Sequence, residues 1–394
     1  MRPSFRSILK RILKAVFKVT LIIILVVVVL AVVTPQGRTA VRTALFVPQV
    51  LPSIPAKPQE WFIGDPVWRQ VSYPQADGQG TADLILPVDA DANSAVLFFL
   101  GVVVNRPRED SRVVALAEGL ARSGMVVMIP WSDTQLQQRI VPNDIDDLVS
   151  GFQYLRSLEE VDPENVGMGG ICTGASMSLI AAQDERIRDD VKFINFISGY
   201  YDAYDLVKAI ASRSRFYGDY VVPWQTDQLA YRVFRNHLLD GVTDLEERDF
   251  LKNVFEDDVP TIDTDVSGLS SEAQAVYMLL AGTPYSEVDG LMEKLSPKTK
   301  QFLREISPST DIEKTRARVL IMHDRADKLV PSEESRRLAD ALSAAPNTYH
   351  TEFSFFQKEI QLHIADAPRV TPLDFVHEAF KLYLHMYNIM RDIS

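Results

Sequence analysis

The stretch that most constrains the fold is residues 170–174, Gly-Ile-Cys-Thr-Gly. It follows an apolar run over 165–169 that is typical of a short strand. It precedes residues 175–182, which are typical of the first turns of a buried helix. A glycine two residues before and two residues after the cysteine indicates a tight strand-to-helix turn, because a Cβ at either place would meet neighbouring backbone. The pattern therefore predicts a strand, a turn that carries Cys172, and a helix.

Cys172 is the only cysteine of the chain. A single cysteine excludes an intrachain disulfide. At the N-terminus of a helix, free N–H groups and the helix dipole favour an anion, so we expect a lowered thiol pKa and a reactive thiolate.

The N-terminal segment is basic and apolar. Residues 1–42 hold eight basic and no acidic residues, so the rest of the chain is more acidic than the total charge of −12 suggests. An acidic body argues against nucleic-acid binding, which needs a basic face. Residues 15–33 are apolar except for Lys18 and Thr20, and a helix of this length spans roughly 28 Å, about the thickness of a bilayer core.

These features predict that residues 1–34 are a basic N-terminus with a transmembrane anchor. The positive charges before the apolar run place the N-terminus in the cytoplasm and the body outside the cytoplasmic membrane. A cleaved signal peptide is the alternative, disfavoured because the apolar run is long and no clear cleavage site follows. Residues 35–60 contain five prolines and predict an extended, semi-rigid linker.

The body alternates strands and helices. Buried strands are predicted at 95–100, 125–130, 191–198 and 318–323, and helices at 111–123, 144–158, 332–344 and 372–390. Such alternation indicates an α/β fold with a mostly parallel sheet covered by helices on both faces. Residues 202–305 break the rhythm with helical patterns at 229–239 and 272–280. We expect a helical cap insertion there, within a core of residues 61–201 and 306–394; a plain surface insert is the alternative.

The strand, turn and helix around Cys172, together with this alternation, resemble the α/β-hydrolase superfamily from about Trp68 to the C-terminus. With cysteine at the centre of the turn, the motif is most similar to dienelactone hydrolase-type proteins. Polyhydroxyalkanoate synthases, which also place a cysteine there under a cap, are a second resemblance and imply acyl transfer.

The resemblance implies a catalytic triad in the chain order nucleophile, acid, histidine. Cys172 is then the nucleophile. Asp327 suits the acid, since it follows the strand at 318–323 and precedes a hydrophobic-Pro pair; Asp324 is the alternative acid. His363 suits the base, because it follows the last predicted strand, at 348–355, and precedes the closing helix at 372–390.

The resemblance also implies an oxyanion hole, made by the backbone N–H groups of Thr173 and Val102, with Gly170 and Gly174 shaping the turn. No cofactor and no metal are implied. The oligomeric state stays open.

Three functions are consistent with these residues. The first is a membrane-anchored hydrolase of a small-molecule carboxylic ester, lactone or thioester, working through a thioester acyl-enzyme. The second is an acyltransferase with the same triad. The third is a non-catalytic binding protein, in which Cys172 is a small apolar side chain.

Overall fold

The computed structural model describes residues 5–75, 78–88, 93–102, 109–256, 264–343, 348–354 and 371–391. His363, the predicted base, lies outside the described residues. Side chains of α1 (Phe5–Val33) are described at 14–22, 25–26 and 29–33.

The described residues form an eight-stranded sheet in the order β1-β2-β4-β3-β5-β6-β9-β10. β2 pairs antiparallel with β1 and β4, and the remaining neighbours are parallel. The strands are β1 (Val67–Gln75), β2 (Gly78–Leu86), β3 (Asn93–Phe99), β4 (Val126–Pro130), β5 (Val161–Ile171), β6 (Phe193–Ile197), β9 (Arg318–Asp324) and β10 (Tyr349–Phe353).

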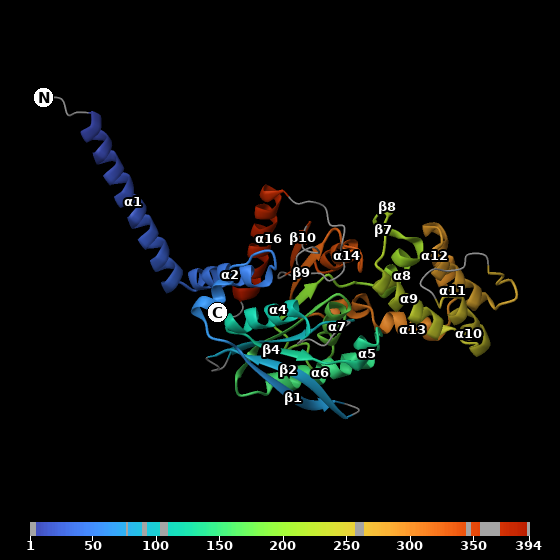
Figure 1. The fold of residues 1–394 in the computed structure, drawn as a ribbon. Helices are drawn as coiled ribbons and strands as arrows, with labels where there is room; N and C mark the ends of the chain where they lie inside the picture. Colours follow the sequence, from blue (N-terminus) through green and yellow to red (C-terminus); the bar gives the residue numbers. More distant parts are fainter. Residues whose placement is uncertain are drawn as a thin grey trace.

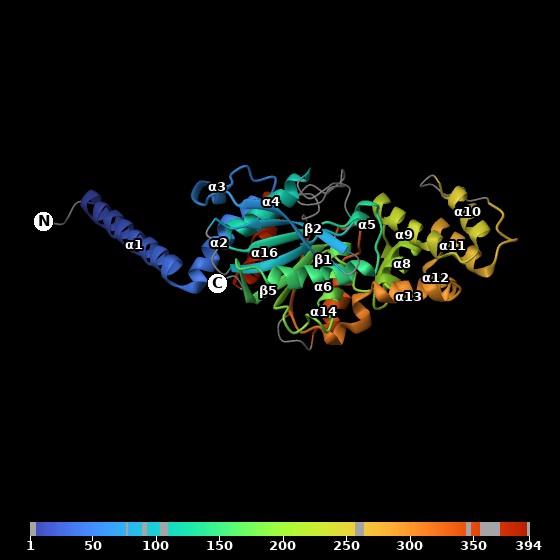
Figure 2. The same cartoon turned by 90° about the horizontal axis from the view of Figure 1, so that it is seen from below.

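Helices cover both faces of the sheet, as the alternation of the sequence predicts (Figures 1 and 2). The core helices are α4 (Ser111–Arg122), α5 (Asp133–Leu136), α6 (Asn143–Arg156), α7 (Thr173–Ala181), the 3-10 helix Pro308–Lys314, α14 (Glu333–Ala341) and α16 (Pro372–Met390). One face packs on α6, α7 and α14, and the opposite face packs on α4 and α16, so each face has its own apolar core. A mostly parallel sheet in this order, with a cysteine turn between β5 and α7, is the α/β-hydrolase fold.

The first strand was not predicted. β1 alternates exposed and half-buried side chains and has only one buried residue, Tyr73, so it lacks the continuous apolar run of the central strands. Its pairing with β2 at the edge of the sheet places it.

The prediction of an extended linker over residues 35–60 is wrong. Residues Pro35–Val50 form helix α2, and Pro58–Phe62 form the short α3. Pro35 stands in the first helical turn, where a proline costs no hydrogen bond, and the Thr34 hydroxyl accepts from Gly37 N–H at 3.0 Å.

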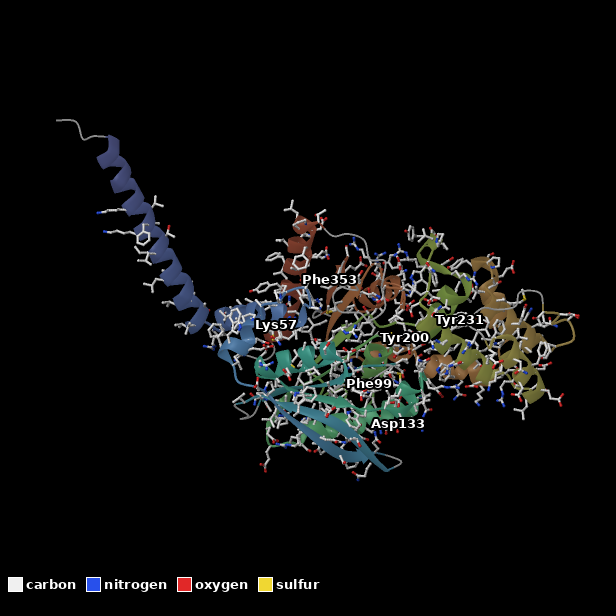
Figure 3. The ribbon with its side chains drawn as sticks, in the orientation of Figure 1. Lys57, Phe99, Asp133, Tyr200, Tyr231 and Phe353 are labelled. Carbon is white, nitrogen blue, oxygen red and sulfur yellow. The ribbon has the colours of Figure 1, made fainter. Side chains whose placement is uncertain are left out.

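Tertiary contacts complete helix α2. The Lys57 ammonium donates to the carbonyl oxygens of Pro48, Gln49 and Leu51 at 2.7 to 3.2 Å, so it satisfies the open end of the helix (Figure 3). Phe46 is fully buried in the core shared with α4 and α16. α2 is therefore part of the folded body.

Helix α1 projects from the end of α2 away from the body (Figure 1). Residues 15–33, predicted to span a membrane, lie within this helix. Judged on the side chains that the structure describes, no helix is both long and apolar enough to cross a membrane.

Between β6 and β9 the chain forms a body of helices beside the carboxyl ends of the strands (Figure 1). It consists of α8 (Ala203–Ser212), the hairpin β7 (Ser214–Tyr217) and β8 (Tyr220–Pro223), α9 (Gln228–Gly241), α10 (Leu245–Val254), α11 (Ser271–Ala281), α12 (Tyr285–Met292) and α13 (Pro297–Glu305). The helices predicted at 229–239 and 272–280 are confirmed as parts of α9 and α11.

Candidate active site

Cys172 directly follows β5 and is the N-cap residue of α7, with φ 56° and ψ −129°, a conformation that L-residues rarely adopt. Its backbone N–H donates to Ile197 O at 2.9 Å, which ties the turn to the neighbouring strand β6. Cys172 therefore lies in a tight turn between a strand and the first residue of a helix, as the sequence predicts.

The two glycines of the motif are required by close backbone contact. A Cβ on Gly170 would lie 2.4 Å from Gly174 C, and one on Gly174 would lie 2.2 Å from Phe99 O. Side-chain carbons do not approach backbone that closely, so α7 can pack on β3 and β5 only with glycine at both positions. The steric reason for the motif is the one expected from the sequence.

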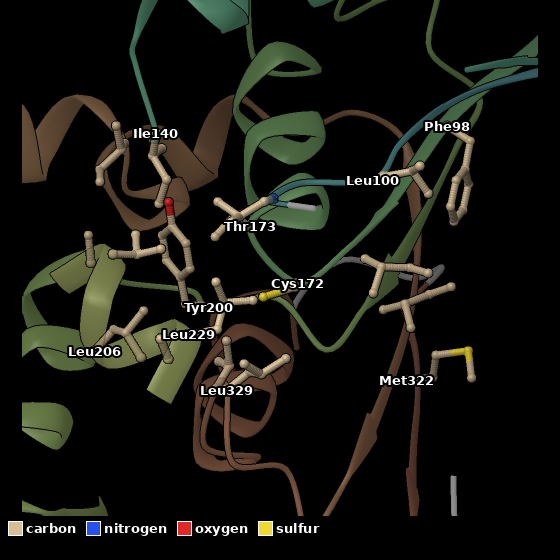
Figure 4. Close-up of a pocket in the computed structure, with 18 of the residues that line it drawn as sticks. Phe98, Leu100, Ile140, Cys172, Thr173, Tyr200, Leu206, Leu229, Met322 and Leu329 are labelled. Atoms are coloured by element: carbon tan, nitrogen blue, oxygen red, sulfur yellow. The ribbon is translucent and has the colours of Figure 1, made fainter. Parts of the chain in front are cut away.

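The Cys172 thiol faces a cavity of about 230 Å³ that is lined mainly by apolar side chains. Figure 4 shows the sulfur between Leu206 and Leu229 of the helical insert on one side and Phe98 and Met322 of the sheet on the other. Cys172 keeps a partly exposed surface, and that surface opens into the cavity.

The pKa of the Cys172 thiol is raised to about 12, mainly by burial and also by the negative charges of Asp327 and Asp227, against a lowering by the Thr173 backbone N–H. The expectation of a lowered thiol pKa is therefore wrong. One N–H group at the start of α7 does not offset the loss of water and two nearby carboxylates. The resting side chain is a neutral thiol.

Asp327 is buried on the turn after β9 and is close enough to raise the pKa of Cys172. Its Oδ1 accepts from the N–H groups of Leu329 and Val330 at 2.7 and 3.1 Å, and its Oδ2 lies 3.5 Å from His323 Nε2. Asp327 is therefore near enough for its charge to act on the Cys172 thiol, but it does not line the cavity that the thiol faces.

His323 was not singled out in the sequence. It is the buried partner of Asp327, and its Nε2 also lies 3.0 Å from Val330 O. Burial lowers its pKa, but the hydrogen bond and charge of Asp327 outweigh burial, so the net shift is upward. His323 does not line the cavity. The alternative acid, Asp324, is buried at the end of β9, and its Oδ1 accepts from Ala326 N–H at 2.8 Å.

The predicted oxyanion donors lie beside each other, but one of them is engaged. Val102 N–H donates to Thr173 Oγ1 at 2.9 Å. Both residues line the cavity, and Thr173 begins α7. In this arrangement the Thr173 hydroxyl oxygen, rather than a ligand, accepts the Val102 hydrogen bond, which leaves the hydroxyl proton as a donor.

Three further polar groups lie in or near the site and were not predicted: Tyr200 and His237 line the cavity, and the charge of Asp227 acts on the Cys172 thiol. Tyr200 is fully buried beside Cys172, and burial raises the pKa of its phenol (Figures 3 and 4). Asp227 caps helix α9 through Leu229 N–H at 2.8 Å. His237 of α9 lines the cavity, accepts from Ile140 N–H at 3.0 Å, and has its pKa lowered to about 4 by burial and Arg139. These residues come from the insert or its border, where no sequence motif marks them.

In the described ranges, no group of three His, Cys, Asp or Glu side chains is arranged to hold a metal ion.

No protein-family model and no curated protein matches the sequence. Among solved structures, the acylaminoacyl peptidase of Pyrococcus horikoshii is similar over 76% of this chain and 40% of its own, at 13% identity and a TM-score of 0.46. The metagenomic carboxylesterase EstE1 is similar over 92% of this chain and 98% of its own, at 13% identity and a TM-score of 0.43. Thermogutta terrifontis esterase 2 reaches 19% identity and a TM-score of 0.43, over 73% of this chain and 86% of its own. The chain spans well under half of the peptidase, and similarity at this level assigns no activity.

Proposed function

We propose that the protein is a hydrolase of carboxylic esters, lactones or thioesters with Cys172 as its nucleophile, similar in its chemistry to dienelactone hydrolases. The observation that carries the proposal is the backbone of Cys172, held at φ 56° with the thiol facing the cavity. Such a conformation costs about 1–3 kcal/mol, and residues held in it cluster at active sites and switch regions. A purely structural cysteine does not need it.

In the proposed reaction, Cys172 Sγ attacks the substrate carbonyl carbon while the thiol proton passes to a general base. The base returns this proton to the leaving oxygen of an ester or lactone, or to the leaving sulfur of a thioester, as its bond to the carbonyl carbon breaks, which leaves a thioester on Cys172. Water then attacks the thioester and gives up a proton through the same base; the carboxylic acid leaves and the thiol is restored. Because the resting thiol is neutral, deprotonation has to accompany attack.

We propose His363 as the base and Asp327 as the acid that orients it. Support for Asp327 is its proximity to Cys172 and its burial. Support for His363 is its place in the chain order, after β10 and before α16. His323 is a weaker choice of base, since it is buried away from the cavity and its Nε2 is occupied by Asp327 and Val330.

Thr173 is proposed to stabilise the oxyanion with its backbone N–H and its hydroxyl. The hydroxyl accepts from Val102 N–H at 2.9 Å, so its own proton can point toward the developing negative oxygen. Val102 then acts through Thr173 instead of touching the substrate, unless substrate displaces the hydroxyl.

The N-terminal helix is proposed to anchor the protein in a membrane, with the body on the extracytoplasmic side. Exposed apolar side chains run along the helix, from Phe17 to Val33, and residues 21–30 are all apolar. Basic residues precede this segment, which supports a cytoplasmic N-terminus.

A non-catalytic binding protein is the second candidate. Two observations favour it: the raised pKa of Cys172, and the engagement of Val102 N–H by Thr173. In this function the cavity holds an apolar ligand and no bond is broken.

The deciding experiment is intact-mass analysis of the full chain after brief exposure to an activated short-chain thioester. A transient acyl adduct on Cys172, followed by release of the acid, supports the hydrolase; His363→Ala should slow adduct formation. A Cys172→Ala protein is the matched control. Absence of both adduct and product in the folded wild-type protein would exclude the hydrolase and favour binding.

A further inference from the structure

The residues that line the cavity at Cys172 fall into two groups, and we call the space beside each group an arm of the cavity. One arm is lined from the insert by α8, α9 and α13. The second arm is lined by α2, α4 and α16, which pack on the opposite face of the sheet. The proposed reaction needs only the part next to Cys172, so the second arm has no role in bond breaking.

The second arm is walled by apolar side chains of α2 and α16. Phe46 and Val50 line it from α2, and Leu382, Met386 and Ile389 line it from α16. A water molecule needs about 10–15 Å³ of such space, so the whole cavity of about 230 Å³ can take a ligand of roughly 15 or more non-hydrogen atoms. Burial of each methylene group in such a wall raises affinity about fourfold.

Apolar side chains are also exposed on the outer surface next to this arm, mainly on α1 and α16; α2 exposes Val41 but also Gln36 and Arg38. α2 directly continues α1, whose described side chains include many exposed apolar ones. On α16, Leu373, Val376, Phe380 and Leu384 are exposed, and their spacing of three and four residues places them on one helix face. α2 and α16 lie side by side (Figure 1). The second arm therefore lies behind the exposed apolar face of α16 and close to the helix that continues into α1.

We propose that the second arm binds the long, unbranched acyl chain of a membrane lipid and thereby sets the substrate class of the Cys172 site. The chain lies between α2, α4 and α16, and its carbonyl end lies at Cys172. The position of the carbonyl rests on the proposed hydrolase function, whereas binding of the chain does not.

The test uses the single cysteine as a reporter and needs no catalytic turnover. Alkyl methanethiosulfonates convert a thiol to a mixed disulfide: the protein sulfur bonds to the alkyl-bearing sulfur, and methanesulfinate leaves with the two electrons of the broken S–S bond. The full chain in lipid nanodiscs is treated with the methyl reagent and with the decyl reagent. The rate of each is followed by intact mass, and the quantity of interest is the decyl-to-methyl ratio.

Val50→Trp fills the second arm, and Val41→Trp on the same helix is the matched control, because Val41 is exposed and does not line the cavity. We expect Val50→Trp to lower the decyl-to-methyl ratio at least tenfold. Val41→Trp should leave the ratio within about twofold of wild type, because the decyl reagent partitions into the nanodisc equally with either variant. Val113→Trp narrows the same arm from α4 and serves as a second variant if Val50→Trp lowers the melting temperature.

A ratio unchanged in both cavity variants would overturn the acyl-chain site. The decyl reagent is also delivered from solution on a carrier protein. If the cavity variants lower the decyl-to-methyl ratio only under that delivery, and not when the reagent comes from the nanodisc lipid, the membrane is not the source of the chain. If the ratio falls but no ester or thioester is hydrolysed, the chain site stands and the hydrolase function fails.

Discussion

The neutral state of Cys172 leads to a quantitative prediction for its reactivity. Burial is the main cause of its raised pKa, and Asp327 adds to it; together they move it from 9.0 to about 12. Each unit changes the thiolate fraction tenfold, so below pH 9 the folded protein should hold about a thousandfold less thiolate than the same thiol in an unfolded chain. Only the thiolate is alkylated, so the rate follows this fraction.

The assay is alkylation by iodoacetamide over a range of pH, read by intact mass, with the guanidinium-unfolded chain as reference. The chain has one cysteine, so each mass addition reports Cys172. We expect the folded rate to keep rising tenfold per pH unit beyond pH 9, where the unfolded rate levels off. Asp327→Asn should raise the folded rate several-fold, because it removes a negative charge that disfavours the thiolate.

A folded rate that levels off below pH 9, or that equals the unfolded rate at neutral pH, would refute this reasoning and show that the helix terminus governs the thiol.

The same pKa shift affects the stability of the fold. Because the folded pKa lies above the unfolded value, the stabilisation by this group is complete below pH 9 and is lost as the pH rises toward 12.

Three further predictions test the turn, the oxyanion donor and the buried histidine. Gly174→Ala should lower the melting temperature strongly, because its Cβ would lie 2.2 Å from Phe99 O. Gly290→Ala in α12 is the control: its Cβ would meet nothing within 4 Å, so the melting temperature should stay unchanged or rise slightly. Thr173→Val should reduce kcat for ester hydrolysis by about 10²–10³-fold while Thr173→Ser retains most of it; equal losses in both would argue against a role for the hydroxyl. His237 has a folded pKa of about 4 against 6.5, so its neutral form stabilises the fold above pH 6.5 and this contribution is lost as the pH falls toward 4. Denaturant unfolding of His237→Gln should show a weaker loss of stability across that range than wild type.

Much of the sheet could be predicted from local pattern. The central strands are continuous apolar runs because both of their faces are covered, and the 372–390 helix is confirmed as α16, Pro372–Met390. The edge strand β1 was missed because its exposed face removes that signal. The five prolines of 35–60 suggested an extended linker, yet Pro35 begins a helix. That helix is held by the burial of Phe46 against α4 and α16, contacts with distant parts of the chain that no local pattern reveals.

The sequence by itself determined the turn at Cys172, because its glycine spacing is a local pattern and a Cβ on Gly170 would meet the backbone of Gly174 only four residues on. The clash of a Gly174 Cβ with Phe99 O, in contrast, depends on the packing of β3 beside the turn. It also determined the alternation that makes an α/β sheet. The state of the thiol was decided only by tertiary structure. Its pKa depends on the water excluded by the packed insert and on Asp227 and Asp327, and a linear pattern carries neither the burial nor these distances.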